Sequence, residues 1–313
     1  MLNQEDASYS SSDEERSFRS GEIHLVSPKI SVRRRLVNIW RYRELLSSLV
    51  RKEITVKYKN SVLGFAWSML NPAMYILIYY VVFQKILKNG VPLYAIYIGV
   101  GLLVWNFFQT AVQGATGTIV DNAGLVKKVA FPREILSLAS VGAALVFFFF
   151  QAIVLIVFLL IFQVVPAFSY LWILPFMLLG LILVASALAV LLSAANVYFR
   201  DVRHLVELLM LAWFWATPVV YTFQTLSSAL QRHGLLPFYF LNPVTSVVLL
   251  FQRALYAKVS PVGTTGHVVH VLATMRPEWY MVSAAVEILV GALLFLGALA
   301  VFSRVEGNFA EEL

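Results

Sequence analysis

The sequence predicts an all-α protein that crosses a membrane several times, and three observations lead to this fold class. Residues 135–199 contain no Asp, Glu, Lys or Arg. A hydrocarbon core of about 30 Å is crossed by about 20 helical residues, so this run is long enough for two crossings, with a break at 165–169. The chain is 60% hydrophobic and only 13% charged, and its apolar windows lack the strict alternation that indicates strands.

Four other windows are poor in charged residues, at 60–84, 89–120, 208–231 and 279–303. Helices satisfy all their backbone groups within lipid, so these windows and the long run predict six transmembrane helices within residues 60–305. Glu287 is the one carboxylate well inside a predicted span. A lone glutamate is weak support for a proton relay, and its simpler interpretation is a protonated or hydrogen-bonded carboxyl between helices.

The distribution of cations predicts the orientation. Six spans place both termini on the same side, and a cytoplasmic placement puts 18 of the 24 Lys and Arg residues inside. Cytoplasmic loops of membrane proteins carry such an excess. The net charge of +7 is therefore a signal of membrane topology, and no nucleic-acid partner is expected.

The sequence lacks several motifs of metal and nucleotide chemistry. It contains no Cys, which excludes disulfides and cysteine-rich metal sites. It also contains neither HExxH nor the phosphate loop GxxxxGK[ST]. We therefore expect a chain that is not an enzyme and has no cofactor or metal of its own. If ATP drives its activity, a separate protein must bind and split the ATP.

The N-terminal segments are polar or amphipathic. Residues 1–30 are rich in Ser and acidic residues and are predicted to be a disordered cytoplasmic tail. Residues 31–59 combine three consecutive arginines with an apolar stripe at helical spacing, which predicts an amphipathic helix at the membrane interface. This helix either anchors the first span or also contacts a partner protein. Lys57 and Lys59 follow, and they either attract a phosphate-bearing lipid or serve as ordinary interfacial cations.

Two cytoplasmic corners connect predicted spans. In the 121–134 corner, Pro132 can begin the next helix, with Glu134 near its positively polarised N-terminus. In the second corner Arg200 stands beside Asp201, and the two side chains can neutralise each other. The C-terminal residues 306–313 are predicted to lie on the same cytoplasmic side.

The outer stretch 222–278 contains an apolar segment at 241–251 that is too short to cross a bilayer. It predicts a re-entrant or interfacial helix that begins near Pro243 and can close the outer end of a pathway. The spans themselves are rich in aromatic residues, most of which are expected to pack between helices or at the interfaces. Some of them can instead line a passage for sugars, and the candidates are Trp67, Tyr75, Tyr79, Trp213 and Trp215.

Five short motifs, in order, give the chain a resemblance to the membrane subunits of bacterial ABC exporters of polysaccharides, the Wzm and TagG-like permeases. The motifs are LGFAWSMLNP at 63–72, FPREIL at 131–136, NVYFRDV at 196–202, WFWATPVVY at 213–221 and LNP at 241–243. Their order and spacing extend over most of residues 31–305. The chain looks most similar to the actinobacterial galactan-exporting branch, although its acidic and serine-rich tail is less typical.

The resemblance implies a homodimer of six-span subunits in the bacterial inner (plasma) membrane. It also implies two copies of a separate ABC ATPase that bind ATP and Mg, and a polyprenyl-pyrophosphate-linked polysaccharide of galactan or O-antigen type as substrate. By position, it assigns ATPase docking to the 36–54 helix and to Phe131, Pro132, Arg133, Glu134, Arg200 and Asp201. It assigns lipid-pyrophosphate contact to Lys57 and Lys59, and the outer gate to Asn242 and Pro243.

Two other classes of function stay open at this point. One is an ABC permease for lipids or drugs, which differs in how wide and how aromatic its passage is. The other is a membrane-embedded glycosyl or acyl transferase, which needs clustered Asp, Glu or His at a membrane face. That cluster is missing from the sequence, so transport is the favoured interpretation.

Overall fold

The computed structural model describes residues 32–59, 66–87, 91–257, 259, 271–273 and 275–313, and the predicted tail at 1–30 lies outside these residues. Every regular element in the described part is a helix, which confirms the all-α class. In chain order the helices are α2 (Val32–Arg41), α3 (Arg43–Tyr58), α4 (Ala66–Tyr79), the π-helix η1 (Tyr80–Ile86), α5 (Tyr94–Asp121), α6 (Ala123–Lys128), α7 (Glu134–Ile161), α8 (Phe168–Leu171), α9 (Leu174–Tyr198), α10 (Val202–Trp215), α11 (Phe223–Arg232), α12 (Leu236–Tyr239), α13 (Pro243–Tyr256), α14 (Pro277–Val305), the 3-10 helix η2 (Glu306–Asn308) and α15 (Phe309–Glu312).

Four helical segments are long and apolar enough to cross a membrane: Tyr94–Asp121, Glu134–Ile161, Phe168–Tyr198 and Pro277–Asn308. They confirm the prediction of a multi-pass membrane protein. The count of six spans stays a prediction, because the windows 60–84 and 208–231 contain shorter helices. The first holds α4 and η1, and the second is divided between α10 and α11.

Helix α5 is the centre of the bundle. It packs against α4, α7, α9, α10 and α13, and 20 of its 28 residues are buried. On the far side of α9, helix α14 packs closely because glycines line the contact. A Cβ atom at Gly291 would lie 2.9 Å from Leu183 Cβ, and one at Gly180 would lie 3.0 Å from Glu287 Cγ. Larger residues at these glycines would push the two helices apart.

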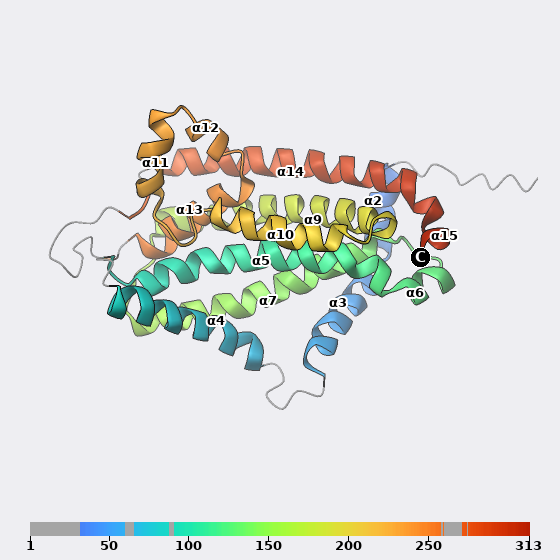
Figure 1. The fold of residues 1–313 in the computed structure, drawn as a ribbon, viewed down its shortest axis with the longest axis horizontal. Coiled ribbons are helices and arrows are strands. Elements are labelled where there is room, and N and C mark those ends of the chain that lie inside the picture. The colour runs from blue at the N-terminus through green and yellow to red at the C-terminus, as the bar shows by residue number, and fades with distance from the viewer. Residues whose placement is uncertain (1–31, 60–65, 88–90, 258, 260–270, 274) are drawn as a thin grey trace, which may run out of the picture. The chain divides into compact units, whose positions relative to one another are not determined.

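The bundle has two distinct ends (Figure 1). One gathers α2, α6, the corner between α9 and α10, and α15; we call it the cation-rich end. The other, which we call the opposite end, gathers α11, α12 and the starts of α5 and α14. The corners at 121–134 and 196–203, which the sequence predicts to be on one side, thus lie at the same end.

The predicted single amphipathic helix at 31–59 is divided in two at Tyr42 in the structure. Helix α2 turns the Arg35 side chain into the protein, where it is 3% exposed, while α3 packs along α7. The contact with α7 is close at Gly142, where a Cβ atom would lie 2.8 Å from Val50 Cγ2. The two helices therefore have different partners, and this accounts for the change of direction between them.

The predicted continuous segment 208–231 is also interrupted, because α10 ends at Trp215 and an irregular corner follows it. Pro218 lacks a backbone N–H and cannot continue the helix. Helix α13 begins at Pro243, as the proline predicts. It has 14 residues, 11 of them buried, and packs against α5, α8, α9 and α14. At about 1.5 Å per residue it is about 21 Å long, and it is too short to cross alone.

Candidate functional site

A groove with a volume of about 380 Å³ lies between α4, α5 and α10. Its walls combine aromatic, amide and carboxylate side chains, in contrast to the purely apolar surface expected of lipid-facing helices. The lining residues are Tyr75, Tyr79, Leu102, Trp105, Asn106, Gln109, Glu207, Met210, Leu211 and Phe214. Trp105 donates its indole N–H to Gln109 Oε1 at 2.8 Å, and its ring packs edge-on against Phe214 with centroids 5.5 Å apart.

The part of α5 that is not buried includes a polar stripe. Between residues 106 and 114 the positions that are not fully buried are all polar or glycine: Asn106, Gln109, Thr110, Gln113 and Gly114. We call these five residues the α5 stripe. Helices α7 and α14 expose large apolar side chains instead, among them Ile156, Leu160, Leu289 and Leu293. Because lipid offers no hydrogen-bond partner, the α5 stripe is suited to face water or a polar ligand.

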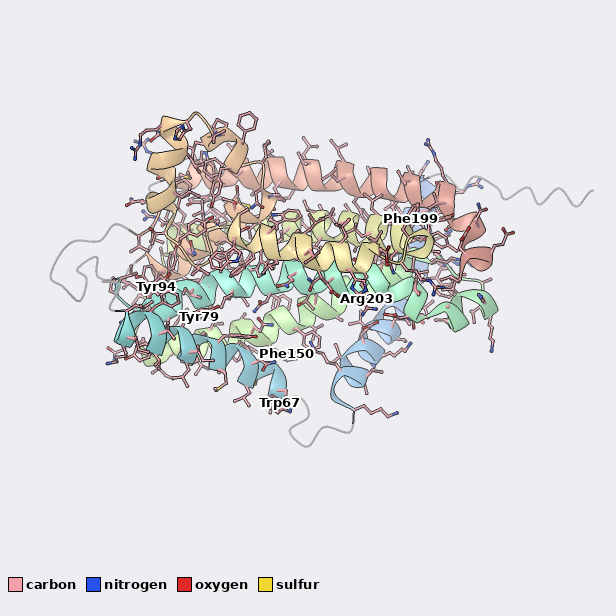
Figure 2. All side chains as sticks on the ribbon, in the orientation of Figure 1. Trp67, Tyr79, Tyr94, Phe150, Phe199 and Arg203 are labelled. Atoms are coloured by element: carbon pink, nitrogen blue, oxygen red, sulfur yellow. The ribbon has the colours of Figure 1, made fainter. Side chains whose placement is uncertain are left out.

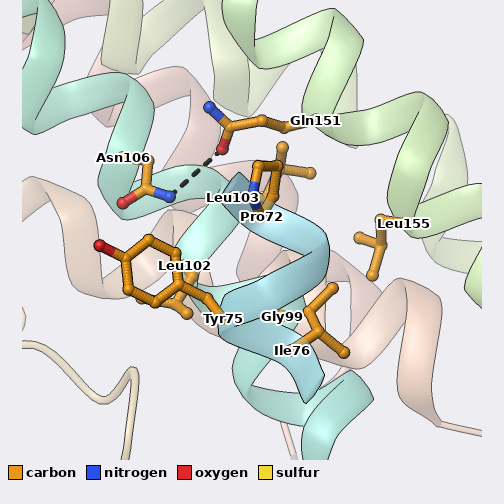
Figure 3. Close-up of a pocket in the computed structure, with 9 residues that line it drawn as sticks. All are labelled: Pro72, Tyr75, Ile76, Gly99, Leu102, Leu103, Asn106, Gln151 and Leu155. Atoms are coloured by element: carbon orange, nitrogen blue, oxygen red, sulfur yellow. Dashed lines mark hydrogen bonds between the residues drawn. The ribbon is translucent and has the colours of Figure 1, made fainter. Parts of the chain in front are cut away.

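A polar pair extends this stripe to α7. Asn106 donates from Nδ2 to Gln151 Oε1 at 3.2 Å, and Figure 3 shows this hydrogen bond beside Tyr75 and Pro72 of α4. The pair fixes the orientation of the Asn106 amide at the floor of the groove. Tyr75 lines both this small pocket and the larger groove.

Two lysines were predicted to lie at the membrane boundary, and the structure places Lys57 deeper along the bundle. Its ammonium lies 4.2 Å from the centroid of the Phe147 ring. Phe147 is 13 residues from the start of α7, which corresponds to about 20 Å along the helix. The first residues of α4 are at a similar level, since Figure 2 shows Trp67 roughly midway between Tyr94 and Phe199. Lys59 is exposed at the end of α3.

At the cation-rich end the structure brings most of the predicted docking residues to one region but buries one of them. Glu134 is fully buried, and its carboxylate pairs with Arg35 at 3.2 Å. Arg133 donates to the backbone oxygen of Glu306 at 2.5 Å. Phe131 and Pro132 are half-buried. This corner is therefore anchored from beneath by charged side chains, and its outer surface is formed by residues 127–132.

Arg35 is the centre of this anchoring. Its guanidinium contacts both Glu134 Oε1 and the Glu306 carboxylate, so it joins α2, α7 and the C-terminal segment. Burial opposes its charge, but the hydrogen bonds and charges of the two carboxylates outweigh burial and raise the pKa of Arg35 above its ordinary value. The guanidinium stays protonated throughout the range in which proteins are studied.

The second predicted corner is more exposed. Arg200 and Asp201 lie between α9 and α10 and are both exposed. The ion pair at this corner is instead formed by Arg203 and Asp121, whose side chains are 52% and 56% exposed and 3.5 Å apart. Arg203 lies against α5 at Gly117, where a Cβ atom would be 3.1 Å from its Nη1. Figure 2 shows Arg203 and Phe199 at the cation-rich end.

At the opposite end, Asn242 connects three segments. Its Oδ1 caps α13 by accepting from the Val244 N–H at 3.1 Å and also accepts from Trp213 Nε1 at 2.9 Å. Its Nδ2 donates to Thr217 Oγ1 at 3.0 Å. The predicted gate residues Asn242 and Pro243 therefore stand where α10, the corner after it and α13 meet.

The backbone carbonyls of the irregular corner at 216–222 are satisfied by side chains. Tyr94 donates its hydroxyl to the oxygen of Val220, Tyr97 donates to that of Tyr221 at 3.2 Å, and Gln252 donates to that of Pro218 at 3.1 Å. Non-helical backbone is tolerated at membrane depth when protein groups pair with it in this way.

The five predicted channel aromatics are divided. Tyr75 and Tyr79 line the groove, whereas Trp213 is half-buried, with its ring 5.0 Å from that of Phe108. Trp67 and Trp215 are 43% and 60% exposed and are not among the groove-lining residues. Sequence reasoning missed Trp105, Asn106, Gln109 and Phe214 as a set. The helical spacing of Asn106, Gln109 and Gln113 on an otherwise apolar helix is the signal that could have found them.

Two further features lie outside the groove: the buried carboxylate of Glu287, and the arrangement of side chains that could bind a metal ion. Glu287 is 7% exposed and lies between α9 and α14. Within the described residues its Oε1 has no hydrogen-bond partner. In the same part of the chain, no group of three or more His, Asp or Glu side chains is arranged to hold a metal ion.

Comparison with known proteins gives a consistent result. Residues 44–256 match the family described as ABC-2 type transporter. The O-antigen export system permease protein RfbA of Myxococcus xanthus is 34% identical over 218 residues, which are 70% of this chain and 82% of that protein. The protein of the same name from Klebsiella pneumoniae is 26% identical over 268 residues, 86% of this chain and 94% of that protein. The chain is thus a multi-pass membrane protein that belongs to the ABC-2 type transporter family.

Proposed function

We propose that this chain is the channel-forming subunit of an ATP-driven exporter of lipid-linked polysaccharide, of galactan or O-antigen type. The exporter moves its substrate from the cytoplasm across the bacterial inner membrane, and both termini of the chain are cytoplasmic. The relatives named as O-antigen export permeases support the substrate class. The family match supports the ABC transport mechanism.

The α5 stripe is the observation that carries this proposal. A sugar chain presents many hydroxyls and flat apolar ring faces, so its passage needs amides and aromatic rings together. The groove offers Asn106 and Gln109 beside Tyr75, Tyr79 and Trp105. A permease for apolar lipids or drugs has less use for a line of amides on its central helix.

A second copy of the chain is the proposed cover of the groove. Helix α10 is attached to the bundle by one narrow stripe, and much of its remaining surface is apolar and exposed. Leu205, Leu208, Leu211 and Trp215 are each at least 55% exposed. Two such helices can face each other across a shared channel, so the functional unit is a homodimer. The copies of α5 then contribute two polar stripes to one passage.

A separate ABC ATPase is proposed to dock at the cation-rich end, with one copy per subunit. The exposed residues Arg200 and Asp201 and the half-buried residues Phe131, Pro132 and Arg133 form its contacts. Glu134 supports these contacts from below through Arg35. ATP and Mg bind to the ATPase, and this chain transmits the resulting movement.

Lys57 and Lys59 are proposed to attract the pyrophosphate of the lipid carrier. A lysine some 20 Å along α7 is costly in lipid unless it has an anionic partner or water. Each charge contributes on the order of 1 kcal/mol to such attraction. The double variant Lys57→Gln/Lys59→Gln should weaken binding of lipid-linked substrate by at most about 30-fold. Equal binding by the two proteins at low salt would assign the lysines to anchoring alone.

The test of the main proposal uses the double variant Gln109→Leu/Gln113→Leu. We expect polysaccharide translocation into proteoliposomes containing the ATPase complex to fall about tenfold. This estimate takes about 0.5–1.5 kcal/mol for each lost hydrogen bond. Binding of the ATPase should be unchanged. The matched control is Val157→Leu on the exposed apolar face of α7, which should transport normally.

Two outcomes would overturn this function. Unchanged polysaccharide transport by Gln109→Leu/Gln113→Leu would show that the α5 stripe does not line the pathway. Failure of the wild-type complex to move polysaccharide, together with transport of free lipids or drugs, would favour the alternative ABC permease for those substrates.

A further inference from the structure

The C-terminal residues 305–313 fold back across the cation-rich end. The hydroxyl of Tyr198, the last residue of α9, donates to the oxygen of Val305 at 2.6 Å. Arg133, directly before α7, donates to the oxygen of Glu306 at 2.5 Å. The segment therefore makes hydrogen bonds to the ends of two long helices immediately after it leaves α14.

A buried ion cluster extends these contacts to α2. Arg35 donates from Nη1 to Glu306 Oε2 at 3.1 Å and to Glu134 Oε1 at 3.2 Å. Its Nη2 also contacts Glu306 Oε1. Arg35 is 99 residues from Glu134 and 271 residues from Glu306 in the chain. One guanidinium thus joins three segments that the sequence keeps far apart.

Phe309 adds an apolar contact to the ionic one. It is fully buried, with its ring 5.4 Å from that of Phe302 and 6.0 Å from that of Tyr198. The Arg133 guanidinium lies 5.7 Å from the same ring. A segment held only by solvent-exposed charges would be weakly attached, whereas a buried aromatic side chain fixes its position.

We propose that residues 305–313 are a C-terminal clamp that couples α2 to the corner before α7, so that both move together when the ATPase moves. This proposal rests on the proposed function. Arg35 and Glu306 are its positioning residues, and they act through the corner at 129–133 without contacting the substrate. Because α7 packs along α5, movement of the clamped unit reaches the helix that carries the α5 stripe.

The arrangement of α2 and α3 indicates that residues 305–313 couple α2 to the corner before α7, and do not merely stabilise their own position. Helix α3 continues from α2 and packs along α7, while the corner at 129–133 leads directly into the same helix. Without the clamp, the Arg35–Glu134 pair still joins α2 to the first residue of α7, but no hydrogen bond connects Glu306 to Arg35 and Arg133. With it, α2 and this corner form a closed ring of contacts, so a displacement of one is imposed on the other.

The variant Glu306→Gln tests the clamp without creating an unpaired buried charge, because Arg35 keeps Glu134 as its partner. The matched control is Glu311→Gln, which changes an exposed carboxylate of the same segment. The chain has no Cys, so a single cysteine introduced by Glu312→Cys carries a spin label at one defined position. Each variant is studied as the full chain in complex with its ATPase, in lipid nanodiscs and in proteoliposomes.

In Glu306→Gln we expect the population with a mobile label to rise about tenfold, the effect of losing one charge-assisted hydrogen bond. The amount of bound ATPase should stay unchanged, while the substrate moved per ATP hydrolysed falls at least threefold. Glu311→Gln should match the wild type in all three measurements. Tyr198→Phe, which removes a different attachment of the same segment, should repeat the pattern with a smaller loss.

Two results would overturn the clamp. One is a mobile label with unchanged transport per ATP, which would leave the segment with a structural role only. The other is an unchanged label in both Glu306→Gln and Tyr198→Phe, because the contacts would then not hold the segment. Failure of the proposed function is distinguishable, since it would show as no polysaccharide transport by the wild type while label mobility still responds to Glu306→Gln.

Discussion

The two ends of the bundle are held together by different chemistry. At the cation-rich end the connections are between charged side chains, with Arg35, Glu134 and Glu306 as the centre. At the opposite end neutral hydroxyl and amide groups donate to backbone carbonyls, as Tyr97 does to Tyr221 and Gln252 does to Pro218. The side-chain contacts therefore have different roles: at the cation-rich end they join regular helices to each other, and at the opposite end they form hydrogen bonds to the carbonyls of irregular backbone.

The physical setting explains this division. The corner after α10 leaves carbonyl groups without helical partners, and in a low dielectric each of them needs a donor. Neutral donors meet this need without placing a charge in the membrane. At the cation-rich end the exposed pair of Arg203 and Asp121 responds to salt more readily than a neutral hydrogen bond, whereas the buried Arg35–Glu134 pair is screened much less. The cation-rich end is therefore the better place for a contact that must change during transport.

The largest effect is expected for Arg35→Met. It leaves Glu134 buried without its cation, and such a loss destabilises a protein by about 3–5 kcal/mol. The midpoint of thermal unfolding in detergent should fall clearly below that of the wild type. The double variant Arg35→Met/Glu134→Gln removes both fully buried charges and leaves only the partly exposed Glu306 charged, so part of the loss should be recovered. An equally unstable double variant would show that packing, and not charge, is the main contribution of Arg35.

A smaller loss is expected for Asn242→Ala at the opposite end. The change removes the cap of α13 and leaves the Trp213 N–H without its acceptor, for a combined loss of about 2–4 kcal/mol. Asn242→Asp keeps the acceptor oxygens and loses only the donor to Thr217, so it should be less harmful. The measurement is unfolding followed by tryptophan fluorescence. If alanine and aspartate were equally tolerated, the contacts of Asn242 would contribute little to stability.

Tyr97→Phe should have a still smaller effect, about 1 kcal/mol for one hydrogen bond to a carbonyl. The salt dependence of this stability loss tests whether the opposite end is held by neutral hydrogen bonds and not by charges. The loss should be the same in 0.1 M and 1 M salt, because neutral groups are not screened. A loss that disappears at high salt would contradict the distinction drawn between the ends.

The smallest effect is expected for Arg203→Gln. Its pair with Asp121 is about half exposed on both sides, and such pairs contribute about 0–1 kcal/mol. Any loss should be present at low salt and absent at 1 M salt, which is the reverse of the result for Tyr97→Phe. A loss as large as that of Arg35→Met would mean that this exposed corner is as important to stability as the buried cluster.

The sequence predicted the features that depend on local composition. The charge-free run at 135–199 indicates α7 and α9 because length and hydropathy alone decide whether a segment can cross. Pro243 marks the start of α13 for a similarly local reason, since proline is favoured in the first helical turn. The two corners at 121–134 and 196–203 were also found at their positions, because each contains charged residues between apolar runs.

Features that depend on distant contacts were not predicted. The 31–59 segment is divided at Tyr42, and Arg35 in its first part meets Glu134 and Glu306. Nothing near Arg35 in the sequence indicates these partners. The same reason explains why Glu134 was assigned to a docking surface although it is buried. The groove was only partly found, because the residues of α4, α5 and α10 that line it come together through tertiary packing.

Helix α13 also has a consequence for the order in which the protein is made. It is too short to be released into the bilayer as a span of its own, and the helices that cover it, α5 and α9, precede it in the chain. Their interface therefore has to be inserted and partly assembled before α13 can be buried. In a chain interrupted before Pro243, the apolar surface that Val248 and Leu250 cover would be exposed; both side chains are fully buried in the complete fold. The late arrival of one short helix thus leaves apolar surface uncovered at the opposite end until residues 243–256 have been made.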